Sequence, residues 1–341
     1  MNIQDENRIP EKRILALDGG GIKGTIQASF LAALERTTGK RVIDYFDLIV
    51  GTSTGGIIAL GLGLGLPAEH LLEFYRTRGP EIFGESGRSH GALNDFWAAL
   101  TRPLRWLRQL TRPKYSSRPL RSALEEAFAE AKLGDCRTRV VIPSFSSHTR
   151  SVYVFKTAHH ERLRTDWQER IVDVALSTSA APTYFTEHHL RSGVRLIDGG
   201  IWANNPVGLA VVEAIGVLKW PAEALRVLSV GCSDTPKNLP EAPGKIKLAP
   251  YVADLFMMGQ AHGSLGTAKL LLGDERRLLR VQPTVPPGEL SLDSFMKIPQ
   301  MEGLGACLAR NYLPRVNEVF FTTPREEFVP IYTASRASSH K

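Results

Sequence analysis

Apolar runs and glycine-rich turns alternate with helical patterns at the start of the chain. The run at residues 13–18 predicts a buried strand, followed by a glycine loop and a helix from Thr25 to about Thr38. The aromatic and β-branched run at 45–50 predicts a second strand, and small residues with spaced leucines from Ala59 onward predict a second helix. This strand–helix–strand–helix order indicates a parallel sheet that helices cover on both faces.

The rest of the chain continues this alternation without an internal repeat. Strands are predicted at 139–143, 151–155, 194–197, 226–231 and 277–282, and helices at 120–131, from 171, at 251–272 and between 301 and 319. The Pro- and Lys-rich stretch 235–250 is typical of a loop, and the polar tail 334–341 of a disordered end. We therefore expect one α/β domain over 1–341, with three α/β/α layers around a mostly parallel central sheet.

Composition adds a preference for anionic surfaces. The chain is 43% hydrophobic and has a net charge of +7, which does not choose between lipid and nucleic acid. Its three cysteines, Cys136, Cys232 and Cys307, are far apart, which argues against a disulfide framework or a zinc site and fits a reducing compartment. The polar start lacks a signal-peptide pattern, and the uncharged run 48–66 is too rich in glycine for a membrane span. We expect a cytoplasmic protein that acts at the inner membrane surface.

Residues 86–117 are predicted to form a basic helical insertion with a single acidic residue, Asp95. Pro103 divides it into two pieces. A helical projection puts apolar residues on one side and arginines on another: Trp97, Leu100, Leu104 and Leu107 against Arg105, Arg108 and Arg112. This pattern is typical of a membrane-surface element. It fits equally well an insertion packed on the core with a solvated arginine face, and the sequence leaves both interpretations open.

A Gly-x-Ser-x-Gly pattern at residues 51–55, with Ser53 at its centre, joins the second predicted strand to its helix. The serine of such a nucleophile elbow has a strained backbone, and the flanking glycines let the strand and the helix approach without Cβ clashes. The hydroxyl is then exposed at the carboxyl end of a strand, with a helix N-terminus behind it that favours negative charge. The same pattern also occurs in ordinary glycine-rich turns.

The loop at residues 19–24, Gly-Gly-Gly-Ile-Lys-Gly, allows two interpretations. It fits a dinucleotide-binding fingerprint, but the acidic residues at the expected distance, Asp44 and Asp47, precede the second strand instead of ending it. A Walker A loop is excluded because Thr25, and not lysine, follows the last glycine. The other interpretation is an oxyanion hole, whose backbone N–H groups face negative charge on a carbonyl oxygen. We favour it, because a serine nucleophile is predicted on the neighbouring strand.

Asp198 is the candidate base for Ser53. A triad in hydrolase order needs a histidine after its acid, and only His262, in mid-helix, and His340, in the tail, follow Asp198. Most histidines are expected at the surface. Asp198 ends a predicted strand before two glycines, so it should project at the same sheet edge as Ser53, although Asp before Gly-Gly is also common in simple turns. A partly desolvated carboxylate with a raised pKa can act as a direct general base, which gives a Ser–Asp dyad.

Three motifs in this order, at 18–24, 51–56 and 198–200, together resemble those of the patatin-like phospholipases. The stretches 179–185, 204–206 and 278–282 are similar to the same family, so the resemblance covers about residues 12–285. It implies Ser53 as the nucleophile, Asp198 as the general base, and oxyanion N–H groups from Gly19, Gly20 and Gly21. The other motif positions are Gly24, Gly51, Gly55, Gly199 and Gly200. Lys23 replaces an arginine frequent in the family, which leaves the backbone donors unchanged.

The resemblance implies hydrolysis of fatty-acyl esters of membrane phospholipids through an acyl-enzyme, with no metal or other cofactor for catalysis. Within the family, the compact length and the Gly-Ile-Lys-Gly variant are similar to the bacterial antiphage (CBASS) effectors, phospholipases switched on by a cyclic dinucleotide. A cGAMP-like activator, oligomerisation on activation, degradation of the cell's own membrane and no binding of DNA or RNA are therefore expected.

Other functions stay open at this point. The chain could be a patatin-like lipase with no nucleotide switch, a dinucleotide-binding oxidoreductase, or a non-catalytic binding module. The sequence does not indicate the acyl position, the head group, the nucleotide-binding residues or the oligomeric state.

Overall fold

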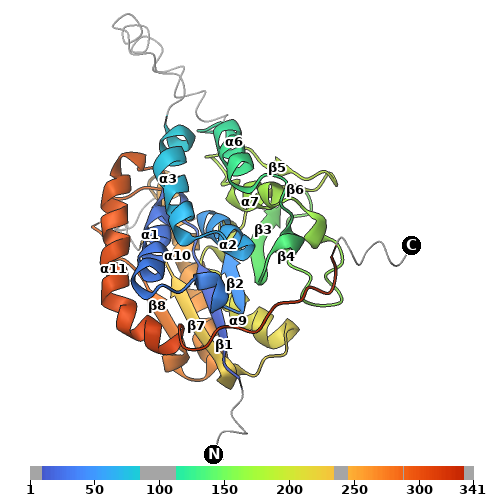
Figure 1. The fold of residues 1–341 in the computed structure, drawn as a ribbon. Coiled ribbons are helices and arrows are strands. Elements are labelled where there is room, and N and C mark those ends of the chain that lie inside the picture. Colours follow the sequence, from blue (N-terminus) through green and yellow to red (C-terminus); the bar gives the residue numbers. More distant parts are fainter. Residues whose placement is uncertain (1–9, 85–112, 234–244, 287, 334–341) are drawn as a thin grey trace, which may run out of the picture.

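The computed structural model describes residues 10–84, 113–233, 245–286 and 288–333, built around one eight-stranded sheet (Figure 1). The strands follow the order β5-β6-β3-β2-β1-β7-β8, and β4 pairs with β3 outside this path. The bounds are β1 Lys12–Leu17, β2 Leu48–Gly51, β3 Arg139–Ser146, β4 Ser151–Lys156, β5 His188–His189, β6 Arg195–Asp198, β7 Leu225–Val230 and β8 Leu278–Val281.

The sheet has a parallel part and an antiparallel part. Strands β8, β7, β1, β2 and β3 run parallel to one another. In contrast, β4 and β6 run antiparallel to β3, and β5 runs antiparallel to β6. A turn of four residues joins β3 to β4, which is too short for a parallel crossover. The expected mostly parallel central sheet is confirmed, with this antiparallel end added.

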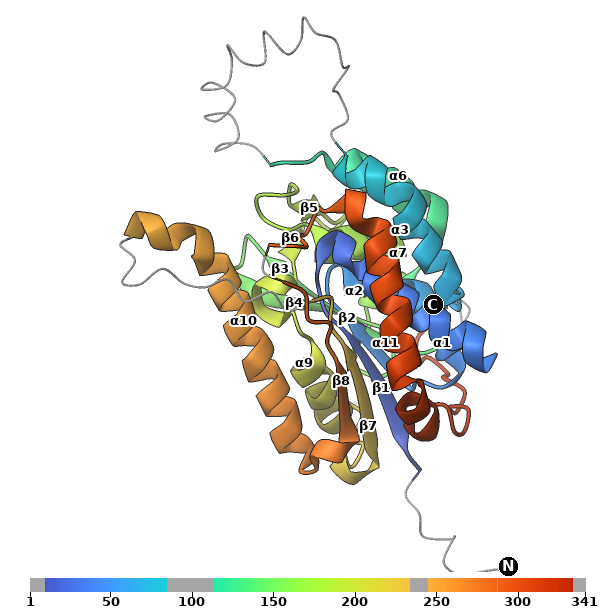
Figure 2. The same ribbon diagram turned by 90° about the vertical axis from the view of Figure 1, so that its left-hand side faces the viewer.

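Helices cover both faces, and the three-layer prediction is confirmed. Alternate residues of β1 point to opposite sides: Leu15 and Leu17 belong to one buried cluster, Ile14 and Ala16 to another. The first face packs on α1 Gly24–Thr38, α2 Thr54–Leu64, α3 Ala68–Phe83, α6 Ser117–Phe128, α7 Ile171–Ser179 and α11 Ile298–Val319. The second face packs on α9 Val207–Val212 and α10 Lys245–Leu272, and α8 Gly200–Ala203 also contacts α10. Figure 2 shows the two helical layers on either side of the strands.

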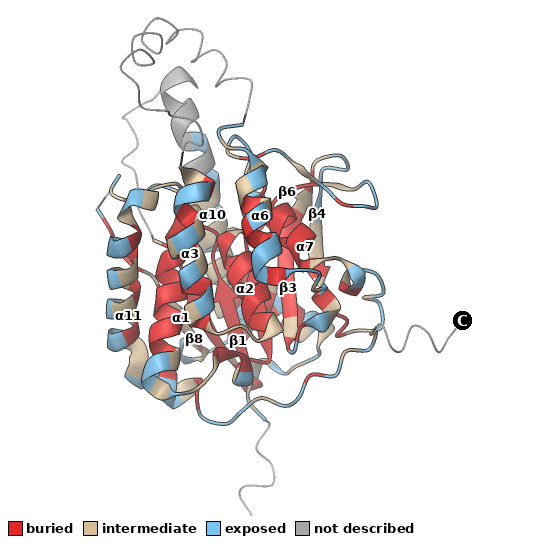
Figure 3. Cartoon of the chain, turned by 45° about the horizontal axis from the view of Figure 1, so that its top comes forward, coloured by how far each residue is buried: buried red, intermediate tan, exposed pale blue. Residues whose placement is uncertain are grey.

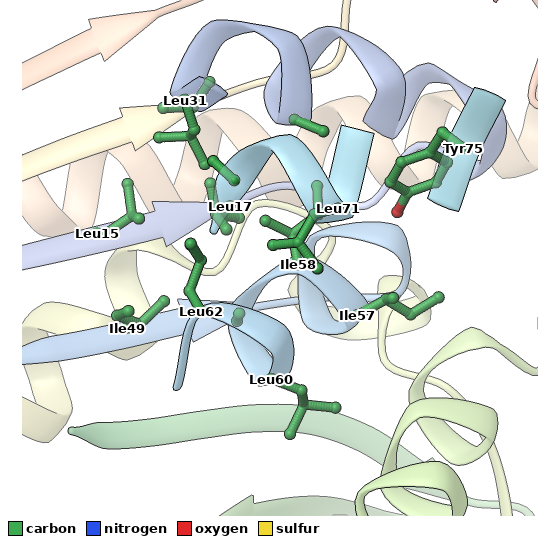
Figure 4. Packing of buried hydrophobic residues seen from close by; sticks show 14 of the residues in the cluster. Leu15, Leu17, Leu31, Ile49, Ile57, Ile58, Leu60, Leu62, Leu71 and Tyr75 are labelled. Carbon is green, nitrogen blue, oxygen red and sulfur yellow. The ribbon is translucent and has the colours of Figure 1, made fainter. Parts of the chain in front are cut away.

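Helix α2 is almost completely enclosed by the protein. Every residue from Thr54 to Gly63 is buried, as the red core of Figure 3 shows. Ile58 and Leu62 of α2 lie between Leu17 of β1 and neighbouring helices in Figure 4. A Cβ at Gly61 would come within 2.4 Å of Leu71, so this glycine allows α3 to approach. The uncharged run 48–66 is thus a strand, a turn and a buried helix, as predicted.

The described part of the chain contains no helix with the length and apolarity needed to cross a bilayer. The packed region continues past residue 285, because α11 contacts α1 and the fully buried Phe320 stacks on Phe46 at a centroid distance of 5.7 Å.

Several predicted boundaries were wrong. The strand expected at 45–50 begins only at Leu48, because residues 42–44 form a 3₁₀ turn and the Asp47 carboxylate accepts the Arg13 N–H. Residues 245–250, predicted as loop, are the first turns of α10; Pro250 removes only one backbone donor near the start of a long helix. The helix expected at 120–131 starts at Ser117, after the N-cap Ser116. The expected tail 334–341, the loop residues 235–244 and the insertion up to residue 112 lie outside the described residues.

Candidate active site

Ser53 lies at a sharp turn between β2 and α2. Its backbone has φ 54° and ψ −120°, and α2 begins at the next residue. A Cβ at Gly51 would lie 2.1 Å from the Gly55 carbonyl oxygen, and one at Gly55 would lie 2.4 Å from the Leu17 carbonyl oxygen. Both glycines are therefore required by backbone contacts, and together they hold the Ser53 side chain at the carboxyl end of β2.

The structure brings Ser53 and Asp198 into direct contact. The Ser53 hydroxyl donates to Oδ2 of Asp198 at 2.7 Å, and the Gly200 N–H donates to Oδ1 of Asp198, also at 2.7 Å. Asp198 is buried and Ser53 is partly exposed. The carboxylate is thus oriented by one backbone donor, and its other oxygen is aimed at the serine.

Burial changes the acidity of this carboxyl group. Desolvation raises the pKa of Asp198 from 3.8 to about 6, and the hydrogen bonds from Gly200 and Ser53 only partly oppose the rise. A carboxylate with this pKa is ionised at neutral pH, yet it is a stronger proton acceptor than an exposed aspartate. This is the electrostatic setting that a general base requires.

The two side chains meet because β2 and β6 lie end to end along one edge of β3. Residues 144–146 of β3 pair with β4 on one edge and with β6 on the other, and Val141 pairs with β4 and β2 in the same way. The parallel β2 ends opposite Val141, and the antiparallel β6 ends opposite Ser144. Their carboxyl ends therefore point toward each other across two residues of β3. Ser53 and Asp198 thus lie together, as expected from the sequence, although β6 reaches this place antiparallel to β3.

The glycine loop after β1 lies beside Ser53. A Cβ on Gly19 would lie 3.4 Å from the Ser53 Cβ and 2.5 Å from Oδ1 of Asn204. The Gly19 N–H donates to the Asn204 carbonyl at 2.9 Å, so this donor is already engaged. Within the described residues, the N–H groups of Gly20 and Gly21 make no hydrogen bond, and Gly21 has a φ of 58°. Two backbone donors thus remain available next to Ser53.

The remaining motif glycines serve close packing. A Cβ at Gly24 would lie 2.1 Å from Oγ1 of Thr54, so this glycine lets the start of α1 approach the start of α2. A Cβ at Gly199 would lie 2.2 Å from the Pro143 carbonyl oxygen of β3. At Gly200 it would lie 3.0 Å from Oδ1 of Asp198, where the backbone N–H must donate.

This chain is similar to proteins of a known family. The patatin-like phospholipase model matches residues 15–211, more than half of the chain, including both Ser53 and Asp198. The chain belongs to the patatin-like phospholipase family. Three curated relatives were compared: two named cGAMP-activated phospholipase, from Pseudomonas aeruginosa and Vibrio cholerae, and Patatin-like protein 4 of Arabidopsis thaliana.

The Pseudomonas relative is 37% identical over 65% of this chain and 63% of its own length. The Vibrio relative is 36% identical over 64% and 63%, and the Arabidopsis relative 34% identical over 61% and 54%. The matched region therefore spans less than two thirds of each relative's own length.

Two residues missing from the predicted site hold this patatin-like dyad in place. Thr178, near the end of α7, accepts the Ser53 N–H at 3.0 Å and donates its hydroxyl proton to the Pro143 carbonyl at 2.6 Å. Two residues after Thr178, the Ala180 carbonyl accepts the Asp198 N–H at 3.0 Å. The end of α7 thus contacts both halves of the dyad. The sequence signals at this place were the Ser-Thr-Ser run at 177–179 and the family-like stretch 179–185, which includes Ala180.

Arg280 of β8 binds the start of the glycine loop. Its guanidinium donates to both carboxylate oxygens of Asp18, the residue after β1, and Nη1 donates to Oγ of Ser229 at 2.7 Å. The two charged side chains are only 19% and 7% exposed. Gln27 of α1 donates to the Asp18 carbonyl at 3.1 Å. The family-like stretch 278–282 included this arginine without indicating what it binds.

The histidines take no part in these described contacts. His188 bonds Asp173, and His159 lies between Thr157 and Glu213. His159 is an exception to the expectation that most histidines lie at the surface, because its side chain is fully buried.

The oxidoreductase alternative does not fit the fold. Asp47 accepts the Arg13 N–H near the start of β1, at the end of the sheet opposite the glycine loop, and Asp44 lies in the 3₁₀ turn that precedes β2. Neither carboxylate can therefore serve a dinucleotide at that loop.

Proposed function

We propose that this chain is a serine acyl hydrolase that cleaves fatty-acyl esters of phospholipids with a Ser53–Asp198 dyad. The observation that carries the proposal is the 2.7 Å hydrogen bond between Ser53 Oγ and Asp198 Oδ2, formed on a nucleophile elbow in a chain of the patatin-like family.

In the first half of the reaction, Ser53 Oγ attacks the ester carbonyl carbon while Asp198 Oδ2 takes the hydroxyl proton. The carbonyl oxygen becomes an oxyanion, which the N–H groups of Gly20 and Gly21 stabilise. The C–O bond to the lysolipid then breaks, and the departing alcohol oxygen receives the proton from Asp198. This leaves the acyl group esterified to Ser53.

In the second half, Asp198 accepts a proton from water as the water oxygen attacks the acyl carbonyl. The bond to Ser53 Oγ breaks, Ser53 recovers its proton from Asp198, and the fatty acid leaves. Asp198 thus acts as base, acid, base and acid in turn, and a pKa of about 6 suits all four transfers. Gly19 has a different part: its engaged N–H fixes the loop at Asn204.

The names of the relatives support a proposal for the substrate and the activator. The names of the two bacterial relatives describe phospholipases activated by cGAMP, so we propose membrane phospholipids as the substrate and a cyclic dinucleotide as the activator. Activation by oligomerisation, degradation of the cell's own membrane at its inner surface, and a role in antiphage defence belong to the same proposal. Catalysis itself needs no metal or cofactor in this scheme, and no DNA or RNA ligand.

A constitutive lipase is the second candidate. The dyad and its two free backbone donors already have the geometry for catalysis, and the plant relative carries the name patatin-like protein, with no activator in it. Hydrolysis of a fluorescent phospholipid in vesicles, with and without a panel of cyclic dinucleotides, separates the candidates. Activation by at least one nucleotide supports the switch, and full activity without any nucleotide contradicts it.

The dyad is tested by labelling and substitution. A fluorophosphonate should modify Ser53 in the unmodified chain, as mass spectrometry would show, and not in Ser53→Ala. Ser53→Ala should abolish hydrolysis, and Asp198→Ala should lower kcat by about 10²–10⁴-fold. Circular dichroism and the unfolding temperature control for folding. An Asp198→Ala variant with retained kcat would reassign the base.

A further inference from the structure

Helix α10 exposes apolar side chains in its N-terminal half. Phe256 is 72% exposed, Leu255 39% and Val252 36%, and Ile201 of α8 adds another apolar side chain at 45%. Between Pro250 and Lys269 the sequence has one carboxylate, Asp254, and one histidine. Scattered apolar residues are normal on protein surfaces, but three within five positions of one helix form a local apolar surface.

These residues continue the face by which α10 packs on the protein. Each step of four residues turns about 40° around the helix axis, so positions 252, 256 and 260 lie within about 80° of one another on neighbouring turns. In the C-terminal half the helix packs on the protein: Ala268 is fully buried, and Ser264 accepts the Gly208 N–H at 2.9 Å. At Gln260 the helix still contacts the protein, through Asn205. On the N-terminal side of Gln260, Phe256 and Val252 lie on the next two turns and are exposed to solvent.

This apolar face leads directly to the candidate active site. The Asn204 carbonyl accepts the Gly19 N–H of the glycine loop, and the next residue, Asn205, donates its N–H to Gln260 of α10. Phe256 lies about one helical turn from Gln260. Ile201 is three positions after Asp198. Because α10 ends where β8 begins, its N-terminal half reaches past the carboxyl ends of the strands, as Figure 2 shows.

We propose that the apolar face of α10 around Val252, Leu255 and Phe256, together with Ile201, docks on the lipid bilayer and orients Ser53 toward it. This rests on the proposed function, since a lipid acyl hydrolase must draw its substrate from a membrane. A bilayer fits this surface better than a soluble partner does for two reasons. The face is continuous with a site that must accept acyl chains, and the net charge of +7 is complementary to anionic head groups.

The test measures vesicle binding separately from turnover. Phe256→Glu and Leu270→Glu are compared in the full chain; Leu270 is 84% exposed on the same helix, at the end away from the site, and is the matched control. Co-sedimentation with vesicles of 7:3 phosphatidylcholine and phosphatidylglycerol uses a Ser53→Ala background, so that the vesicles stay intact. Phe256→Glu should weaken binding by about tenfold or more, and Leu270→Glu should leave it unchanged.

Hydrolysis completes the test. In chains that retain Ser53, with any activating nucleotide present, Phe256→Glu should lower the rate on vesicles by about tenfold, and the rate on a soluble short-chain nitrophenyl ester by less than twofold. Equal losses on both substrates would overturn the proposal, because the residue would then belong to the site itself. Unchanged vesicle binding would also overturn it.

A second copy of this chain, instead of a bilayer, could cover the apolar face of α10. Light scattering after size-exclusion chromatography distinguishes the two. A loss of oligomer mass in Phe256→Glu and not in Leu270→Glu would overturn docking on lipid. A wild-type chain that hydrolyses no ester, yet binds vesicles through Phe256, would refute the proposed function and still support the docking surface.

Discussion

The two halves of the dyad are positioned in different ways. Ser53 belongs to a continuous stretch, β2–turn–α2, whose shape follows from glycines and from a helix buried on all sides. Asp198 ends a strand of four residues, and its place depends on β3, on the end of α7 and on the Gly200 N–H.

The difference extends to stability. The turn at Ser53 is held by close backbone packing, whereas Asp198 is a buried carboxylate whose ionisation opposes folding. The position of Ser53 is thus a local feature of the chain, and that of Asp198 is a long-range feature that costs stability. Substitutions in each half should reveal this contrast.

The largest effect is expected in the local half. In Gly51→Ala the new Cβ would lie 2.1 Å from the Gly55 carbonyl oxygen, so the turn must open, at a cost of about 4 kcal/mol or more in the free energy of unfolding. Gly216→Ala, which has no atom within 4 Å of its new Cβ, is the control and should change little. Urea denaturation measures both. A Gly51→Ala chain of normal stability would mean that backbone packing does not hold the elbow.

Arg280 tests whether long-range contacts also support the local half. Arg280→Gln removes the guanidinium that binds both oxygens of the buried Asp18 carboxylate, which should cost about 3–5 kcal/mol of stability and lower kcat more than it raises KM, through displacement of the glycine loop. Arg280→Lys should recover part of kcat. The control, Arg276→Gln, removes a guanidinium that is 85% exposed and should have almost no effect. Equal kcat values in Arg280→Gln, Arg280→Lys and Arg276→Gln would show that Arg280 does not position the glycine loop.

Asp198→Asn should stabilise the protein while it inactivates it. The folded pKa of about 6 lies above the ordinary 3.8, so the protonated carboxyl stabilises the fold at low pH, and this contribution is lost as the pH rises through about 6. At pH 8 the ionised wild type should be about 3 kcal/mol less stable than Asp198→Asn.

Unfolding temperatures from pH 4 to 8 would show the wild type and the variant diverging as the pH rises. The wild-type kcat/KM on a soluble ester should increase with pH through about 6, as Asp198 becomes a base. Parallel stability curves for the two proteins would show that Asp198 is not desolvated as described.

Thr178 joins the two halves and gives the smallest expected effect. Thr178→Val leaves the Ser53 N–H and the Pro143 carbonyl unpaired, which should cost about 1–3 kcal/mol and reduce kcat. Thr178→Ser keeps the hydroxyl and should keep kcat. If Thr178→Val and Thr178→Ser have the same unfolding temperature and kcat, the hydrogen bonds of the Thr178 hydroxyl do not stabilise the contact between Ser53 and Asp198.

Much of the fold could be predicted from the sequence because it depends on short-range rules. Apolar runs predicted the parallel strands, and glycine spacing predicted the turn at Ser53, since both depend on neighbours within a few residues. The start of β2 and of α10 could not be read in this way, because side-chain caps and tertiary packing fix such boundaries.

The sequence by itself determined the candidate residues: a serine between glycines, an aspartate before Gly-Gly and a glycine loop after the first strand. Only the tertiary structure decided how they meet. Strand β6 runs antiparallel to β3 and ends opposite the end of β2, and Thr178, Asn204 and Arg280 hold the parts together from distant positions. The physical reason is that strand direction and register are fixed by pairing between segments far apart in the chain, and no local pattern of residues encodes that pairing.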